Sequence, residues 1–177
     1  QMGLKWVDID KNLQENLLSS VDRNTVHFIP QEIAMTLLAV NQMGLKWVDI
    51  KRNLQENLLS SVDRNTVHFR PQEIAMTLLA VNQMGLKWVD IKSNLQENLL
   101  SSVDRNTVHF RPQEIANTLF ALDGLALEVS DLKHAKNSLL DAVTRLCTKF
   151  DSRDMVTCVE ALDHIGFFWR DFQERLQ

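Results

Sequence analysis

The sequence predicts an all-α fold, namely an α-solenoid of tandem two-helix hairpins. Three observations lead to this prediction: a repeat with a period of 41 residues, prolines and glycines that share the period, and apolar residues at helical spacing. Residues 1–41 and 42–82 differ at only three positions: Asp10/Lys51, Lys11/Arg52 and Ile29/Arg70. A unit of this length cannot bury its apolar faces alone, so stacked units must share one core.

The repeat divides the chain, taken as a single solenoid fragment over residues 1–177, into four units and a remainder. The units are residues 1–41, 42–82, 83–123 and a diverged 124–164, and residues 165–177 are part of a further unit. Phe110 and Phe150 lie 40 residues apart, so the diverged unit is one residue short. The outermost units are expected to expose apolar surface, through which copies of the chain can associate end to end.

Each unit is expected to hold two helices. In residues 42–82, the apolar spacing predicts a first helix over residues 49–66, with Asp49 as its N-cap. A second helix is predicted to start at Pro71, with Glu73 beside the positive end of the helix dipole. Gly85 is expected to end this helix in a left-handed conformation. No stretch alternates apolar and polar residues for long enough to predict a strand.

The composition excludes several classes of protein. Apolar residues make up 45% of the chain and charged residues 24%, which is typical of a folded protein, and no apolar run is long enough to span a membrane. With a formal net charge of −4, the chain lacks the basic excess common in nucleic-acid-binding proteins. Cys147 and Cys158 form neither a Cys-x-x-Cys motif nor a dense disulfide pattern, which indicates a reducing compartment.

The sequence contains no catalytic constellation, so we expect neither an enzyme nor a cofactor. It has no glycine-rich phosphate loop, nucleophile elbow or His-Glu-x-x-His motif. Cys147, Cys158 and His164 have neither the spacing nor the number of ligands that zinc needs, so no metal is expected. The histidines of the recurring Val-His-Phe motif are expected to be loop residues: His27, His68 and His109.

Basic residues near the helix starts are the first set of candidate binding residues: Lys51, Arg52, Lys92, Arg70 and Arg111. Together with the free backbone N–H groups of a helix start, such cations can hold phosphate, and the alternative is a solvated charge. The two helix starts of an antiparallel hairpin lie at opposite edges. The basic residues are therefore expected to form two edges, not one stripe.

Asparagines at helical spacing are the second set of candidates: Asn53, Asn57, Asn94 and Asn98. Each pair is predicted to lie on one polar face of a first helix. Amide side chains can read the edges of single-stranded RNA bases, and a repeat protein can present one base to each unit. They can equally form hydrogen-bonded ladders between stacked helices, and the sequence leaves both interpretations open.

All four tryptophans occupy one place in the repeat: Trp6, Trp47, Trp88 and Trp169. Such rings can stack on nucleic-acid bases or seal the joint between units. Trp47 lies between the helix-ending Gly44 and Asp49, among apolar neighbours. In the fourth unit Val129 replaces the ring, a change that a core tolerates and a stacking site does not. We therefore predict a structural role for the tryptophans.

The stretch at residues 110–125 reads FRPQEIANTLFALDGL and resembles the signature of octotricopeptide repeats. The matching residues are Pro112, Gln113, Glu114, Ala116, Asn117, Thr118, Leu119, Ala121 and Leu122. The resemblance implies a right-handed solenoid of helical hairpins that binds single-stranded RNA in organelles. Similar repeats also occur in large proteins of intracellular bacteria.

Together these features predict a non-catalytic binding module. The leading hypothesis is single-stranded RNA bound by the inner face of the stacked helices. The alternative is a protein-interaction scaffold, for instance in a bacterial effector that engages host proteins. The near-neutral units favour the protein partner, since nonspecific nucleic-acid affinity scales with the phosphates neutralised. The expected compartment is the cytoplasm, an organelle matrix or, for an effector, the host cytosol.

Overall fold

The computed structural model describes residues 5–168 and 170–171, and every regular element within these ranges is a helix. The first helices of the four units are α1 (Lys11–Asn24), α3 (Arg52–Asn65), α5 (Ser93–Asn106) and α7 (Ala135–Leu146). The second helices are α2 (Pro30–Gln42), α4 (Pro71–Gln83), α6 (Pro112–Gly124) and α8 (Ser152–Ile165). Short 3-10 helices flank α1, α3 and α5, as Trp47–Asp49 and Thr66–His68 flank α3, and a further one, Cys147–Lys149, follows α7. The predicted all-α solenoid of two-helix units is confirmed.

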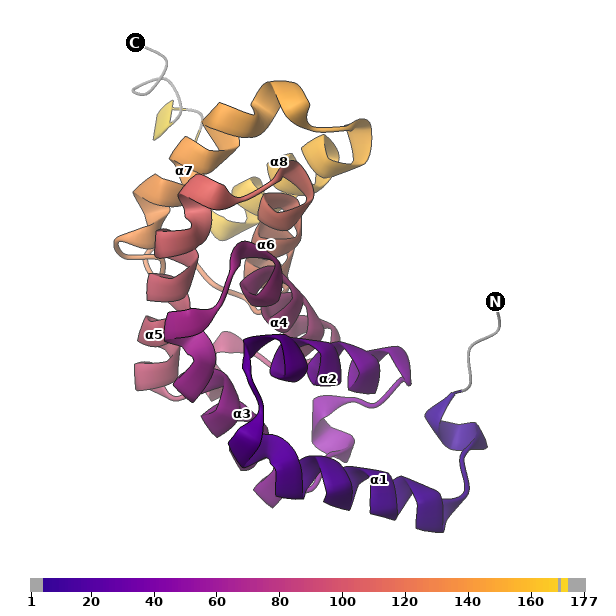
Figure 1. Ribbon diagram of the computed structural model, residues 1–177. Coiled ribbons are helices and arrows are strands. Elements are labelled where there is room, and N and C mark those ends of the chain that lie inside the picture. Colours follow the sequence, from indigo (N-terminus) through magenta and orange to yellow (C-terminus); the bar gives the residue numbers. More distant parts are fainter. Residues whose placement is uncertain (1–4, 169, 172–177) are drawn as a thin grey trace.

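The eight helices form two arcs, with α1, α3, α5 and α7 on the outer arc and α2, α4, α6 and α8 on the inner arc (Figure 1). Successive second helices contact one another extensively, whereas successive first helices touch at far fewer places. The spacing of packed helices depends on the side chains between them. The second helices contain small buried residues that allow a close approach: Ala34, Ala75, Ala80, Ala116 and Ala121. The second helices therefore line the concave side of the solenoid.

One apolar core runs through all four units. Ile74 and Leu78 of α4, and Ile115 and Leu119 of α6, have no exposed surface. The core residues of one unit are covered partly by the next unit. Stability is therefore expected to depend on contacts between neighbouring units, as in other repeat proteins.

The start of the first helix differs from the prediction. α3 begins at Arg52, and Asp49 is not its N-cap. The Asp49 carboxylate instead accepts a hydrogen bond from the Lys46 N–H, 3.1 Å away, across the 3-10 turn that begins at Trp47. A carboxylate satisfies whichever unpaired N–H the backbone turns toward it, and this turn brings Lys46 close. The same contact recurs at Asp8, Asp131 and Asp171.

The second helices begin and end as predicted. Pro71 is the first residue of α4, and the Glu73 carboxylate accepts a hydrogen bond from the Arg70 N–H at 2.8 Å. Gly85 follows the helix with φ of +90°, and Gly44 has φ of +88°. A left-handed conformation costs a residue with a Cβ about 1 kcal/mol, which explains why glycine recurs at this place.

The glycine is missing after α6, because Ala126 holds the place with φ of +64°. We expect Ala126→Gly to raise the free energy of unfolding by about 0.5–1 kcal/mol, since the left-handed conformation strains alanine and not glycine. Urea denaturation measures the change. Gly85→Ala is the reciprocal control and should lower the stability by a similar amount. A less stable Ala126→Gly variant would contradict this explanation.

Candidate functional site

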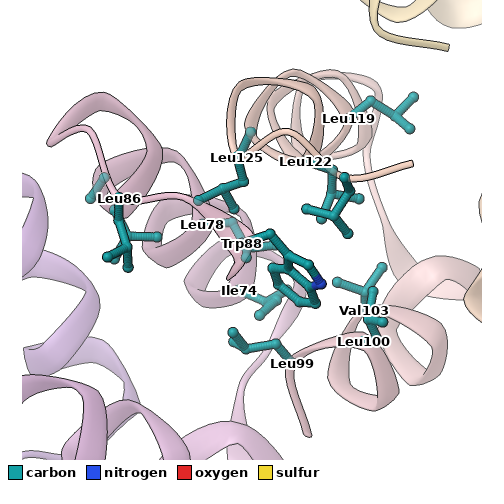
Figure 2. Packing of buried hydrophobic residues seen from close by; sticks show 14 of the residues in the cluster. Ile74, Leu78, Leu86, Trp88, Leu99, Leu100, Val103, Leu119, Leu122 and Leu125 are labelled. Carbon is teal, nitrogen blue, oxygen red and sulfur yellow. The ribbon is translucent and has the colours of Figure 1, made fainter. Parts of the chain in front are cut away.

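The recurring tryptophans are part of the joint between units. Only 8% of Trp47 and 5% of Trp88 is exposed. Figure 2 shows the indole of Trp88 enclosed by side chains that include Leu78 of α4, Leu99 of α5 and Leu122 of α6. A ring enclosed by three helices is not available to stack on a base, so the predicted structural role is confirmed. The fourth ring, Trp169, lies outside the described residues.

The backbone of the same loop is tied to the end of the following second helix. The Trp88 N–H donates to the Leu125 carbonyl at 2.8 Å, and the Gln96 side chain donates to the Trp88 carbonyl at 2.7 Å. In the fourth unit Val129 keeps the backbone contact, because its N–H donates to the Ile165 carbonyl at 2.8 Å. The backbone hydrogen bond of the joint is therefore kept where the ring is absent. The ring contributes buried apolar surface to the joint.

The candidate asparagines are bound to the neighbouring unit on the outer arc. Four hydrogen bonds join the first helices: Asn53–Asp22, Asn57–Asp22, Asn94–Asp63 and Asn98–Asp63, at 2.8, 2.8, 3.0 and 2.8 Å. Each aspartate uses both carboxylate oxygens and accepts from two asparagines. The structure thus contains the hydrogen-bonded ladder between stacked helices, which was the alternative to base reading. It places these amides away from the inner face.

A second ladder between the same helices was missed by the sequence reasoning. Arginines of α3, α5 and α7 donate to a carbonyl at the end of the preceding first helix: Arg64–Thr25, Arg105–Thr66 and Arg145–Thr107, at 2.9, 2.8 and 2.7 Å. Buried asparagines do the same one residue later: Asn65–Phe28 and Asn106–Phe69, both at 3.0 Å. These side chains satisfy carbonyls that a helix end leaves unpaired. The recurring Asp-Arg-Asn triplet was the available signal.

The basic candidates lie at two edges, as predicted. Lys51 and Lys92 are the N-cap residues of the outer helices α3 and α5, whereas Arg70 and Arg111 are those of the inner helices α4 and α6. Arg52 is the first residue of α3. The structure does not bring the two groups together, and all five side chains are exposed.

Carboxylates accompany several of these cations. Arg52 lies 3.0 Å from Glu56, and Arg111 lies 2.6 Å from Glu114, whose hydrogen bond and charge raise the pKa of Arg111. Lys51 shares a shallow pocket of about 120 Å³ with Asn53 and with the acidic Glu15 and Asp22. Lys92 and Asn94 share a similar pocket of about 130 Å³ with Glu56 and Asp63. These acidic neighbours repel phosphate and weaken the case for an anion site.

The inner face carries a different set of residues, which the sequence reasoning did not select as a site. Each of the first three second helices carries a stripe of exposed or half-buried amide and apolar side chains at helical spacing. The stripe consists of Gln31, Met35, Leu38 and Gln42 in α2, of Gln72, Met76, Leu79 and Gln83 in α4, and of Gln113, Asn117 and Phe120 in α6. Met35 is 55% exposed and Phe120 is 43% exposed. We call these residues the inner stripe.

The inner stripe continues into a polar groove of about 410 Å³ between α4, α6 and α8. Gln83, Gln113 and Asn117 line one side of the groove, and Arg153 and Asp154 of α8 line the other. Burial and the nearby charge of Asp151 raise the pKa of Asp154. The groove therefore offers neutral amides, the cation of Arg153 and the two carboxylates of Asp151 and Asp154.

The model of a family described as a protein of unknown function, DUF1601, matches residues 2–37, 43–78 and 84–119. These matches cover more than half of the 177 residues. The chain belongs to the DUF1601 family. No curated protein matches it.

Each DUF1601 match corresponds to one structural unit of the solenoid. The match at residues 84–119 includes Trp88, all of α5 and α6 as far as Leu119. It thus contains the residues with which this unit donates to both ladders, and Gln113 and Asn117 of the inner stripe. The DUF1601 family model leaves the diverged fourth unit unmatched, although α7 and α8 continue the two arcs (Figure 1).

Neither cysteine of this DUF1601 chain has a metal-binding neighbourhood within the described residues, where no group of three or more candidate ligands occurs. Cys147 is exposed and Cys158 is buried, and neither forms a disulfide. Burial raises the pKa of the Cys158 thiol to about 12, which makes it a poor nucleophile and a poor metal ligand. Among the described residues, no helix is long and apolar enough to cross a membrane.

One contact between the third and fourth units of this DUF1601 chain depends on pH. His164 Nδ1 lies 3.0 Å from an oxygen of Asp123, and this hydrogen bond and the aspartate charge raise the pKa of His164. A pKa raised by folding contributes stability that is fully present below the unfolded value, about 6.5, and is lost as the pH rises through the folded value. A titration of the imidazole protons by NMR should show a lower midpoint for His164 in Asp123→Asn. An unchanged midpoint would contradict the pairing.

Proposed function

We propose that this chain is a non-catalytic scaffold whose inner stripe binds an extended segment of a partner protein. The observation that carries the proposal is the repetition of glutamine, of methionine or asparagine, and of leucine or phenylalanine on three consecutive second helices. Solenoids use such concave surfaces to bind elongated ligands. The stripe repeats with the units, so it suits a ligand that runs along the arc.

The chemistry of the inner stripe fits a polypeptide. A glutamine amide donates and accepts hydrogen bonds, so a row of them can pair with the N–H and C=O groups of an extended backbone. Met35 and Met76 have flexible thioether side chains that adapt to different apolar partners. Phe120 supplies the kind of aromatic side chain on which much binding energy is often concentrated.

Single-stranded RNA is the second candidate ligand, supported by the resemblance of residues 110–125 to octotricopeptide repeats. RNA affinity grows with the number of phosphates neutralised by lysine and arginine. The inner stripe contributes no cation, and Arg153 is the cation that lines the adjoining groove. The asparagines offered as base readers already bind aspartates. These observations favour a protein partner. The proposal includes a host protein in a reducing compartment as such a partner.

Selection from a random peptide library tests the proposal, with the 177-residue chain as bait. Peptides enriched in the selection should bind the wild-type chain with little dependence on salt. Met35→Lys and Phe120→Lys should each weaken binding of these peptides about tenfold or more. Val48→Lys is the matched control, since Val48 is 84% exposed in a loop outside the stripe. Equal losses in all three variants, or none in the stripe variants, would contradict the proposal.

The same chain should be titrated with oligo(U) and oligo(A) RNA at low salt. We expect no binding. RNA binding that falls steeply with salt, and that disappears in a Lys51→Ala, Arg52→Ala, Lys92→Ala variant, would overturn the protein proposal in favour of RNA.

A further inference from the structure

The inner surface changes its chemical character along the solenoid. In α2 and α4 the inner stripe is uncharged, and α8 continues the inner arc beyond α6 (Figure 1). At the equivalent places, 40 positions apart, Arg153, Thr157, Glu160 and His164 of α8 stand where α6 has Gln113, Asn117, Phe120 and Gly124. The N-cap changes too, from Arg111 in α6 to Asp151 in α8. The inner surface is therefore neutral and partly apolar at one end and charged at the other.

Asp154 differs from the residues at the same place in the other second helices. In α6 the Glu114 carboxylate accepts a hydrogen bond from the N–H of the N-cap residue Arg111 at 2.8 Å. In α8 the contact runs the other way, because the Asp151 carboxylate accepts from the Asp154 N–H at 2.8 Å. Among the described residues, none donates a hydrogen bond to the Asp154 carboxylate. This carboxylate therefore remains available on the wall of the polar groove.

The surroundings of Asp154 favour a cation. Asp154 is half-buried, and burial is the largest cause of its raised pKa, followed by the charge of Asp151. A carboxylate that has lost part of its water, and that has a second carboxylate nearby, is stabilised in its charged form by an incoming cation. Arg153 offsets one of the two negative charges, so the charged residues that line the groove leave a formal charge of −1.

The rest of the polar groove suits the long side chain of a basic residue. The amides of Gln113 and Asn117 supply carbonyl oxygens that accept hydrogen bonds. Phe120 lines the same groove, and the 43% of this residue that is exposed can offer the face of its ring to a cation. A guanidinium group has five donors and stacks on aromatic rings, so arginine can use the carboxylates, the amides and the ring together.

We propose that the polar groove between α4, α6 and α8 binds a basic side chain of the partner segment, while apolar residues of that segment lie on the inner stripe of α2 and α4. This inference rests on the proposed function, because it names the chemistry of the partner at the same surface. An acidic side chain could pair with Arg153, but it would meet two carboxylates in the same groove. The formal net charge of −4 also favours a basic partner.

The spacing of the helices sets the length of the segment. Packed helices lie roughly 8–10 Å apart, so α2 and α8 are separated by about three such steps. An extended chain advances about 3.3 Å for each residue and crosses this distance in about eight residues. The basic residue is therefore expected about eight residues from the apolar residues that contact Met35 and Leu38.

Selection from a library of random peptides of about twelve residues, with the 177-residue chain as bait, tests the inference. The enriched peptides should carry arginine or lysine at one and the same end, and apolar residues toward the other end. Replacing the basic residue of an enriched peptide with glutamine should weaken binding about tenfold. Since one or two ion pairs are involved, the dependence on salt should stay far below that of RNA binding.

The double variant Asp151→Asn, Asp154→Asn removes both carboxylates from the groove. Asparagine is as good an N-cap as aspartate, so the start of α8 should be kept, and circular dichroism checks the helical fold. The variant should bind a selected basic peptide about tenfold more weakly, with no further loss when the peptide carries glutamine instead. Glu15→Gln, Glu97→Gln is the matched control. It changes the net charge equally, at exposed sites on α1 and α5, and should bind like the wild type.

A titration of the Asp154 side-chain carboxyl by carbon-13 NMR gives a second readout. A bound basic peptide should lower the pKa of Asp154, because a nearby cation favours the carboxylate. The same peptide with glutamine in place of the basic residue should lower it less. An aspartate that only stabilises the start of α8 would show the same pKa with both peptides.

The outcomes separate this inference from the proposed function. A chain that enriches no peptide contradicts the proposed function, and this inference with it. Enriched peptides that depend on Met35 and Phe120 but show no excess of arginine or lysine leave the proposed function standing and overturn this inference. Equal losses in the Asp151→Asn, Asp154→Asn variant and its control, or an Asp154 pKa that both peptides leave unchanged, would also overturn it.

Discussion

Replacing Trp88 with alanine is expected to lower the free energy of unfolding by about 3–5 kcal/mol. The ring is 5% exposed and lies among side chains of α4, α5 and α6 (Figure 2). Its loss leaves a cavity at the meeting point of three helices from two units, where the backbone hydrogen bond to Leu125 prevents the loop from collapsing inward. Because the cavity opens at a junction, the cost falls on the coupling between units as well as on one unit.

Urea denaturation followed by circular dichroism measures this loss. Val89→Ala is the control, since the neighbouring Val89 is 85% exposed and its replacement should change the stability by at most about 0.5 kcal/mol. Trp6→Ala should cost less than Trp88→Ala, because Trp6 is only half-buried in the first unit. A Trp88→Ala chain that keeps its stability and loses peptide binding would instead make the ring a ligand contact.

The fold was predictable because the sequence repeats almost unchanged. The 41-residue period, Pro71 and Gly85 mark the boundaries of the second helices in the right places. The start of the first helix was not predictable in the same way. Asp49 has unpaired N–H groups on both sides, at Lys46 and at the start of α3, and the pattern does not reveal the 3-10 turn that selects Lys46.

The candidate site was less predictable, because it depends on which layer of helices lies inside. The polar face of Asn94 and Asn98 was found from helical spacing, but its partner Asp63 lies 31 and 35 residues away in the preceding unit. The inner stripe could be recognised only with knowledge of how the solenoid curves. The curvature follows from alanines that let the second helices approach one another closely. Helical spacing alone does not contain either piece of information.

Replacing Asn106 with alanine is expected to cost on the order of 2 kcal/mol of folding free energy. Its side chain is 5% exposed and donates to the Phe69 carbonyl at 3.0 Å and to the Ser102 carbonyl at 2.8 Å. The Phe69 carbonyl belongs to the preceding unit, so the variant removes a buried contact across the junction. A buried carbonyl left without a donor carries its full desolvation penalty, which is larger than the net value of the bond.

The repeat supplies a matched control for this prediction. Asn24 holds the same place in the first unit, but it is exposed and donates only to the Ser20 carbonyl of its own helix at 2.7 Å. Asn24→Ala should therefore cost about 0.5 kcal/mol or less. Asn65→Ala should resemble Asn106→Ala, and the double variant should show the sum, since the two junctions share no partner atom. Similar losses at all three positions would mean that the asparagine stabilises its own helix end, and that the contact across the junction contributes little.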